Sequence, residues 1–535
     1  MARFPNIFTM FLFFSFLFQP PISRAQGGNV NVPAGTGSIP LSSEIEFAPG
    51  VSVNVATSNV RLDIPIRSKD GKIPFSYDLV ANSSMFVGPS TTGGSSYENP
   101  MRLEGVSGFS NIPTYQVSLV GGCQWPNEQI SYCISAPQPS LNYQVTGGGT
   151  TCNWYFLDAT QALHNFPSET NSGGNCPIGT WVTQDGSGIT LNTTNTHIQT
   201  RSGDVATNTE VFSSNTCSGI HLPISGTHTF ADPDNLQILE QWNWATPPSG
   251  CTPGTGLQQT FSDQSGSGVN LMTVAAANLQ NQGTQNLKST YTYTDGTGKL
   301  ETYTVKYQAY HVHTYFSQCS PGDIGNSALG VSYLPYEIDR PDGTTWGITY
   351  ETNGDGSVTS RIASITLPTG GSVSFVYTST TGSAQQKQGL DCNSNVVPVM
   401  HVTTNDNNGN ISTWVITNTN DSAGNSGPND YTVTIEDPLQ NYSKKWFNGT
   451  FITQEQKAAG SSTLLSQTLV CYNHNYQGCA QPNIAIEFPI FQMYTLQFPV
   501  ISGVVQNPSI TETVFDNESF TTVVPPSRTG HDHTV

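Results

Sequence analysis

Apolar and polar residues alternate with a period of two from residue 51 onward, which is the pattern of β-strands with one buried face. The first apolar positions of this pattern are Val51, Val53, Val55, Leu62, Ile64 and Ile66. Asp70-Gly71 follows them, and an Asp-Gly pair between apolar runs marks a hairpin turn. The alternation therefore predicts an N-terminal β segment over residues 51–104.

The strand pattern is stronger after residue 287, where β-branched and aromatic residues fill short segments bounded by Gly, Asp, Asn or Pro. These segments are 290–294, 300–310, 346–350, 362–367 and 373–377, with further turn-and-strand pieces at 406–416 and 431–447. We expect no long amphipathic helix. The predicted fold class is all-β, in which several small, sandwich-like antiparallel units precede stacked β-hairpin repeats, with few helices.

One turn-and-strand unit occurs twice, 27 residues apart. Residues 341–350 read PDGTTWGITY and residues 368–377 read PTGGSVSFVY, so that Pro, Gly, a large apolar residue and Tyr fall in register. The matching positions are Pro341 and Pro368, Gly343 and Gly370, and Tyr350 and Tyr377. Such a unit cannot bury its own apolar face, so its repetition predicts stacking into a larger sheet.

The part between these regions is irregular, with short apolar pieces separated by Gly-rich and Asn-rich loops. Six of the ten cysteines lie between Cys123 and Cys251. In an oxidising compartment an even number of cysteines favours disulfides, which compensate for a small buried area by restricting the unfolded chain. A metal cluster is the less favoured alternative because no C-x-x-C occurs.

Export is predicted by the first residues. Arg3 precedes an apolar run at 11–18, which is followed by Pro20-Pro21 and small residues before Gln26. This order is typical of a secretory signal peptide, and the run is shorter than the ~20 residues that span a bilayer. We expect a secreted or cell-surface protein without a transmembrane anchor after signal cleavage.

Seven segments follow from these patterns. They are a signal peptide at 1–25, a linker or arm at 26–50, the N-terminal β segment at 51–104, a cysteine-containing irregular β domain at 105–286, a repeat region at 287–400, a further repeat region at 401–506 and a poorly ordered tail at 507–535.

Charge excludes one class of partner. Only 10% of the residues are charged and the formal net charge is −19. Binding to nucleic acid requires a basic patch that releases counterions from phosphates, so nucleic acid is excluded as an expected partner.

Three sequence fragments resemble the rearrangement-hotspot (RHS) and tyrosine-aspartate (YD) repeat proteins of bacteria. The residues that match the YD repeat in the first fragment are Tyr291, Tyr293, Asp295, Gly298, Lys299 and Leu300, with one residue inserted before the aspartate. Residues 406–411, DNNGNI, are similar to the Asp-x-x-Gly-Asn variant, and residues 59–66 with 70–75 resemble the opening segment of large exported members.

The resemblance implies a β-sheet shell that can enclose a toxic C-terminal domain. This chain has neither the long repeat array, nor the core segment, nor the effector domain of that family, so it resembles the leading part of such a protein. The implied function is that of a non-catalytic exported scaffold for surface display, adhesion or packaging. The implied partners are a cell-surface or glycan ligand, or a downstream repeat or toxin segment.

Candidate chemistry is sparse. His311 and His313 would share one strand face and could hold a metal, but aromatic neighbours favour ordinary packing. Repeated Asp-Gly turns, such as Asp185-Gly186 and Asp295-Gly296, offer oxygen ligands for calcium but lack the closing glutamate of an EF-hand, so turn chemistry explains them better. His531 and His533 lie in the predicted tail.

The remaining hypothesis concerns sugars. Trp242 and Trp244 share one face of a predicted strand beside amides and could stack on a glycan, although core packing explains them better. No G-x-S-x-G, H-E-x-x-H or Walker A motif occurs, so we assign no catalytic, cofactor-binding or metal-binding residue and expect no cofactor. The alternative function is a secreted glycan-binding or glycan-degrading protein on a β scaffold.

Overall fold

The computed structural model describes the chain between residues 44 and 514, with gaps. The described backbone covers residues 44–55, 59–70, 75–82, 103–109, 121–123, 131–133, 140–146, 149–157, 163–165, 169–171, 179–183, 188–192, 197–199, 203, 205–217, 220–247, 255–264, 268–277, 287–311, 331–378, 399–420, 430–448, 451–460, 463–473, 492–501 and 504–514. For residues 103–171 only the backbone is described. The predicted signal peptide lies outside these residues.

All regular elements in the described residues are β-strands, and they form antiparallel sheets. A five-stranded sheet comes first, in the order β1 (Glu44–Ala48), β2 (Val51–Asn54), β3 (Asn59–Lys69), β4 (Phe75–Asn82) and β5 (Leu103–Phe109). Two small sheets follow: β6 (Gly121–Cys123) with β7 (Ser131–Cys133), and β8 (Ser140–Thr146), β9 (Gly149–Leu157), β10 (Leu163–Asn165) and β11 (Glu169–Asn171). The predicted all-β class is confirmed.

The rest of the described chain forms one antiparallel sheet of 23 strands in sequence order, which we call the large sheet. Its strands are β12 (Thr180–Val182), β13 (Thr190–Asn192), β14 (His197–Gln199), β15 (Val205–Cys217), β16 (Ile220–Ala231), β17 (Gln237–Thr246), β18 (Thr255–Asp263), β19 (Val269–Ala275), β20 (Leu287–Thr294), β21 (Leu300–His311), β22 (Val331–Asp339), β23 (Thr345–Thr352), β24 (Val358–Thr366), β25 (Ser372–Thr378), β26 (Val399–Asn405), β27 (Ile411–Asn420), β28 (Asp430–Glu436), β29 (Tyr442–Asn448), β30 (Phe451–Ala459), β31 (Thr463–Tyr472), β32 (Gln492–Ile501), β33 (Val504–Val505) and β34 (Ser509–Val514).

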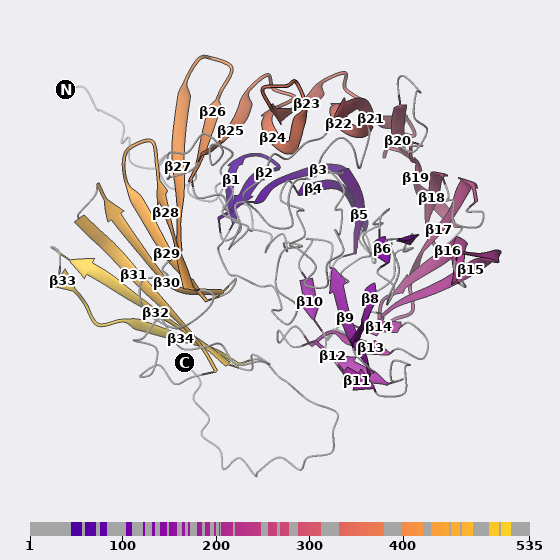
Figure 1. Cartoon of the computed structure of the whole chain (residues 1–535), viewed down its shortest axis with the longest axis horizontal. Coiled ribbons are helices and arrows are strands. Elements are labelled where there is room, and N and C mark those ends of the chain that lie inside the picture. Colours follow the sequence, from indigo (N-terminus) through magenta and orange to yellow (C-terminus); the bar gives the residue numbers. More distant parts are fainter. Residues whose placement is uncertain are drawn as a thin grey trace, which may run out of the picture.

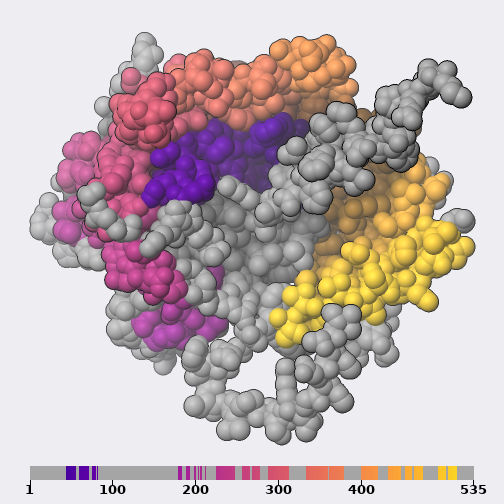
Figure 2. All heavy atoms as spheres, turned by 180° about the vertical axis from the view of Figure 1, so that it is seen from behind, coloured from indigo at the N-terminus to yellow at the C-terminus, as the bar shows by residue number. Residues whose placement is uncertain are grey.

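The large sheet follows an arc around the five-stranded sheet, from β12 on one side to β34 on the other (Figure 1). Figure 2 shows from behind that the indigo residues of the five-stranded sheet lie against the middle of this arc. We call the side of the large sheet that packs on β1–β4 the inner face. Strands β19 and β20 pair across the boundary expected near residue 287, so the sheet is continuous there. Strand β34 lies in the segment expected to be poorly ordered.

A single type of turn joins six of the hairpins. In each, the first residue donates its N–H to the carbonyl of the residue four positions later and accepts the N–H of the residue three positions later. The residue three positions after the first has a positive φ. This geometry is that of a type I turn closed by a bulge. The turns begin at Asp232, Asp295, Arg340, Asn353, Leu367 and Asp437. The first of them, between β16 and β17, lies in the part of the sequence predicted to be irregular.

Cysteine side chains are described at one position, Cys471 on β31. It is buried and disulfide-bonded, and no complete disulfide lies within the described residues. The six cysteines between Cys123 and Cys251 lie outside the described side chains, so cross-linking there stays a prediction. Mass-spectrometric mapping of the non-reduced protein tests it.

Candidate functional site on the inner face of the large sheet

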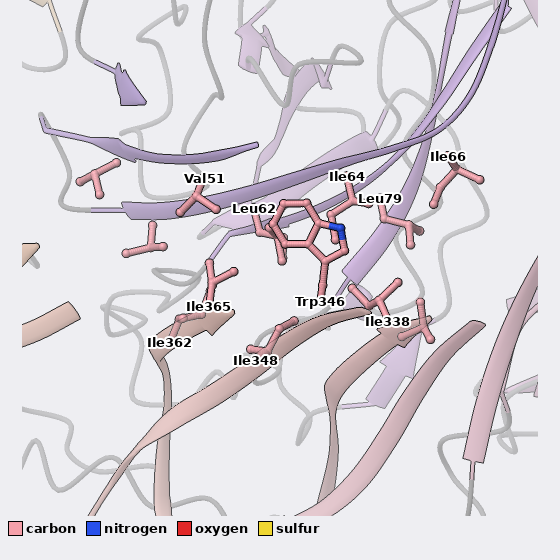
Figure 3. Close-up of a cluster of buried hydrophobic side chains, with 14 of the residues drawn as sticks. Val51, Leu62, Ile64, Ile66, Leu79, Ile338, Trp346, Ile348, Ile362 and Ile365 are labelled. Atoms are coloured by element: carbon pink, nitrogen blue, oxygen red, sulfur yellow. The ribbon is translucent and has the colours of Figure 1, made fainter. Parts of the chain in front are cut away.

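Apolar side chains of two sheets meet at the inner face. Figure 3 shows Ile338, Trp346 and Ile348 of β22 and β23 pointing toward Leu62, Ile64 and Leu79 of β3 and β4. The indole of Trp346 lies between the two sheets, and all six side chains belong to one continuous buried cluster. Because burying one large apolar side chain contributes about 1.5–3 kcal/mol, this contact attaches the five-stranded sheet firmly to the large sheet.

Aromatic pairs extend this contact along the arc. Tyr77 on β4 lies with its ring centroid 5.4 Å from that of Phe261 on β18 and 5.9 Å from that of Tyr291 on β20. Near the other end, Phe47 on β1 meets Trp414 on β27 edge-to-face at 5.3 Å. The five-stranded sheet therefore touches the large sheet from β18 to β27. Burial raises the pKa of Tyr77 well above its ordinary value, and the nearby carboxylate of Glu240 adds to the effect.

Charged groups hold the same interface at its margin. Lys69 of β3 forms an ion pair with Asp263 of β18 at 2.5 Å, and the guanidinium of Arg67 lies 4.8 Å from the ring centroid of Tyr293. Tyr293 is one of the predicted repeat residues. Cation–π contacts and partly buried ion pairs depend on direction. These contacts therefore fix the orientation of the five-stranded sheet on the large sheet more than they strengthen its attachment.

Gly50, between β1 and β2, shows how closely the chain is packed. Its φ is +76°, and a Cβ at this position would lie 2.2 Å from the carbonyl oxygen of Asp63. The N–H of Asp63 donates to the Gly50 carbonyl at 2.7 Å. Only glycine fits this turn without moving β3, which carries Leu62 and Ile64 into the interface.

The two copies of the 27-residue unit have the same structure. Strand β22 has an extra residue, Tyr336, where it pairs with β21, and β24 has an extra residue, Ala363, where it pairs with β23. Beyond each bulge the pairing to the following strand ends, and a tyrosine spans the gap. Tyr350 donates its hydroxyl to the carbonyl of Pro335, and Tyr377 donates to that of Ile362 at 2.7 Å. Both hydroxyls therefore bind the carbonyl just before a bulge.

A third tyrosine makes the same bond outside the predicted repeat. Thr453 is the extra residue of β30, and Tyr472 on the next strand donates its hydroxyl to the carbonyl of Ile452 at 3.1 Å. We call Tyr350, Tyr377 and Tyr472 the bulge tyrosines. All three are buried. Each compensates for a carbonyl that the bulge removes from the strand ladder.

The other predicted motif residues occupy a turn or its flanks. Tyr291 faces the interior, while Asp295 begins the β20–β21 turn. The Asp295 carboxylate accepts the Thr297 hydroxyl at 2.7 Å and the N–H groups of Lys299 and Thr297 at 2.9 and 2.8 Å, and these bonds lower its pKa. Gly298 supplies the positive φ, whereas Lys299 and Leu300 are exposed. The motif therefore encodes a hairpin.

Pro341, Gly343, Pro368 and Gly370 likewise lie in hairpin turns, where both glycines have positive φ. The Asp342 carboxylate accepts from the N–H and hydroxyl of Thr344, and these bonds lower its pKa. The oxygen atoms of these Asp-Gly segments thus serve their own turns.

A buried polar cluster of His228, Glu240 and Gln259 was missed by the sequence analysis. His228 Nδ1 lies 2.9 Å from one carboxylate oxygen of Glu240, and Gln259 donates to the other at 2.7 Å. All three side chains are at most 3% exposed. A pattern does point to Glu240, because it lies in phase with the apolar residues Ile238 and Trp242 of β17.

Two further ion pairs lie in buried positions of the large sheet. Arg361 binds Glu351 through Nη2 at 2.6 Å, and its guanidinium stacks 4.2 Å from the ring centroid of Tyr377. Lys445 lies 3.2 Å from Glu455, and burial lowers its pKa against the opposing effect of that carboxylate. Because each buried cation has a carboxylate, the charges are compensated locally.

Trp242 and Trp244 do share one face of β17, as the alternation predicts, but that face is buried. Their exposed fractions are 3% and 6%, their rings meet edge-to-face at 6.4 Å, and they pack with Leu257 and Ala276. A sugar stacks on an accessible ring face. This geometry supports core packing for the two indoles.

The histidine hypotheses fall mostly outside the described chain. His311 is the last residue of β21 and is exposed, while His313, His531 and His533 are not described, and neither is Asp185. No described element is a helix of the length and hydropathy that crossing a bilayer requires.

Comparison with protein families and with curated proteins gives no match. The inner face thus has to be interpreted from its own geometry. The inner face is a curved apolar surface whose buried charges are compensated, and it is suited to holding a β-sheet such as β1–β4.

Proposed function

We propose that this protein is a non-catalytic, exported β scaffold that resembles the leading part of an RHS or YD-repeat protein. Its role is the display, adhesion or packaging of another polypeptide segment. One observation carries the proposal: a continuous sheet of 23 antiparallel strands bends around a separate sheet of the same chain and buries it on its inner face.

The local chemistry supports a structural role for the motif residues. Asp295 and Gly298 build a turn, Tyr350 and Tyr377 bind carbonyls next to bulges, and Tyr291 packs on Tyr77. Each of these contacts shapes the sheet. The glycan alternative depends on accessible indoles, and the burial of Trp242 and Trp244 gives it no support.

Cell fractionation tests export. The full chain is expressed beside a Phe14→Arg variant, which interrupts the apolar run of the signal. We expect the unaltered chain at the cell surface or in the medium, with an N-terminus near Gln26, and the variant inside the cell. Equal retention of both chains in the cytoplasm would contradict export.

A polysaccharide panel tests the absence of catalysis. We expect the purified full chain to release no reducing ends from any member of the panel over long incubation. Release of sugar by the folded chain, abolished by heating it above its melting temperature, would replace the scaffold with a glycan-degrading enzyme.

A further inference from the structure

The two ends of the large sheet differ in how their edges are protected. An edge strand presents unpaired N–H and C=O groups, and proteins block such edges with short strands, Lys, Pro or bulges. The first strand, β12, has three residues. The last, β34, has six residues without Lys, Arg or Pro and pairs with β32 in unbroken register, while Pro508 and one extra residue separate it from β33 on the same edge of β32. No described strand pairs with the outer edge of β34.

Exposed apolar side chains gather at the same end. Of the twelve large apolar side chains that are exposed among the described residues, six lie on or beside β31–β34. They are Leu465 (51%), Ile501 (62%), Val504 (62%), Val505 (45%), Ile510 (47%) and Val514 (55%). Figure 2 shows these last strands, in yellow, at the surface. A gathering of this kind marks an interaction site more often than chance exposure does.

Charge at this end is limited to one residue. Within residues 463–473, 492–501 and 504–514, Glu512 is the only charged side chain. Its Oε1 accepts hydrogen bonds from Gln492 Nε2 at 2.6 Å and from the Tyr494 hydroxyl at 3.0 Å. Both donors are neutral, so the carboxylate keeps an uncompensated negative charge among the described residues.

The order of side chains on β34 specifies what would fit beside it. Ile510, Glu512 and Val514 alternate and therefore point to one face of the sheet. Side chains directly opposite on a neighbouring strand contact these three, and opposite charges in such pairs stabilise the pairing. The complementary strand has an apolar residue, a cation and an apolar residue at alternate positions.

A second copy of this chain fits poorly. Antiparallel pairing of β34 with itself places Glu512 opposite the Glu512 of the other copy, or opposite Ile510 or Val514 when the register shifts by two residues. The first arrangement is repulsive and the others place a carboxylate against an apolar side chain. The charge therefore selects a different polypeptide.

We propose that the outer edge of β34 is a docking site for an extended strand of a partner polypeptide, which pairs antiparallel to residues 509–514 and places a lysine or arginine opposite Glu512. Main-chain hydrogen bonds supply the affinity, and the alternating side chains supply the specificity. The role of this partner rests on the proposed scaffold function, whereas the docking edge itself is a property of the fold.

Peptide binding to the full chain tests the proposal. The probe is a capped, fluorescent nine-residue peptide of alternating Val and Thr in which the central Val is replaced by Lys, which we call the Lys peptide. The matched Glu peptide carries Glu at the central position. We expect the Lys peptide to bind about fivefold more tightly than the Glu peptide, the ratio for one cross-strand charge pair exchanged for repulsion. The Glu512→Lys variant is expected to bind the Glu peptide more tightly than the Lys peptide.

The matched control is Asp234→Lys, which makes the same change of charge at an exposed turn between β16 and β17. It keeps the original preference for the Lys peptide. A Lys peptide with N-methylated amides along one edge does not bind, because it cannot complete the ladder. Circular dichroism melting confirms that both variants are folded.

Three results would overturn the docking site: no binding of either peptide, equal binding of both, or the same preference in Glu512→Lys as in the unaltered chain. Self-association through β34, seen as a concentration-dependent mass that Glu512→Lys does not change, would also overturn it. Each of these outcomes leaves the export and glycan tests of the scaffold unaffected, so the two proposals fail separately.

Discussion

Two stretches of the inner face of the large sheet are built from different kinds of contact. Strands β22–β24 present apolar side chains to β3 and β4, and the buried hydroxyls of Tyr350 and Tyr377 bind carbonyls within the large sheet. Strands β16–β18 instead bury the carboxylate of Glu240 between His228 and Gln259, and this carboxylate adds to the effect of burial on the pKa of Tyr77. The inner face thus combines an apolar contact with the five-stranded sheet and a polar cluster within the large sheet itself.

The difference teaches what each stretch contributes. An apolar contact is strong but non-directional, so it tolerates sliding of one sheet over another. A buried hydrogen-bonded cluster adds little net stability, yet it penalises any arrangement in which its members separate. Because His228, Glu240 and Gln259 lie on three neighbouring strands of the large sheet, we infer that β22–β24 hold the five-stranded sheet and that the cluster fixes the register of β16, β17 and β18.

The largest expected effect is on the apolar side of this comparison. Trp346→Ala removes the indole between the sheets and leaves a cavity, which lowers the free energy of unfolding by about 3–5 kcal/mol. Urea unfolding followed by tryptophan fluorescence measures it. Val376→Ala on the outer face, where Val376 is 54% exposed, is the control and changes stability by about 0.5 kcal/mol or less. Equal effects of the two substitutions would refute the apolar attachment.

A smaller loss is expected on the polar side. Glu240→Gln keeps the size of the side chain but can accept from only one of His228 and Gln259, at a cost of about 1.5–3 kcal/mol. The control is Glu301→Gln, which removes an exposed ion pair with Lys299 worth about 0–1 kcal/mol. Chemical denaturation compares them, and a Glu240→Gln variant as stable as the control would show that the cluster is dispensable.

The bulge tyrosines come next in size. Tyr350→Phe and Tyr377→Phe each delete one hydroxyl that binds a buried carbonyl, at a cost of about 1 kcal/mol. Because the two sites are equivalent, we expect equal losses. Tyr303→Phe is the control, since Tyr303 is buried on β21 without a hydroxyl partner among the described residues, and it changes little. A loss for Tyr303→Phe as large as the other two would remove the special role of the bulges.

Sequence alone predicted the strands that make the apolar contact, but it predicted neither their contact with one another nor the polar cluster, for a physical reason. The 27-residue repeat and the alternation at residues 51–66 are local patterns, and the structure follows both in register. The His228–Glu240–Gln259 cluster depends on which strands become neighbours, and a buried Glu looks like an exposed one in a sequence. The hairpin that begins at Asp232 was missed because Asn235, rather than Gly, supplies its positive φ.

The smallest expected effect lies at the hairpin tips of the repeat region. Hydrogen bonds from neighbouring side chains and amides lower the pKa of Asp295, Asp342, Asp406 and Asp437. A carboxyl whose folded pKa is lowered stabilises the fold fully above its unfolded pKa of about 3.9, and this contribution is lost as pH falls through the lowered value.

Amide hydrogen exchange of Thr297 and Lys299 measures this loss at one tip, because both N–H groups bind the Asp295 carboxylate. We expect their protection, corrected for the intrinsic pH dependence of exchange, to fall below about pH 4 in the unaltered chain. Asp295→Asn keeps an acceptor oxygen that does not titrate, so its protection stays level over the same range. If the two chains lose protection in parallel, the acid response belongs to the sheet as a whole rather than to the carboxylate of this turn.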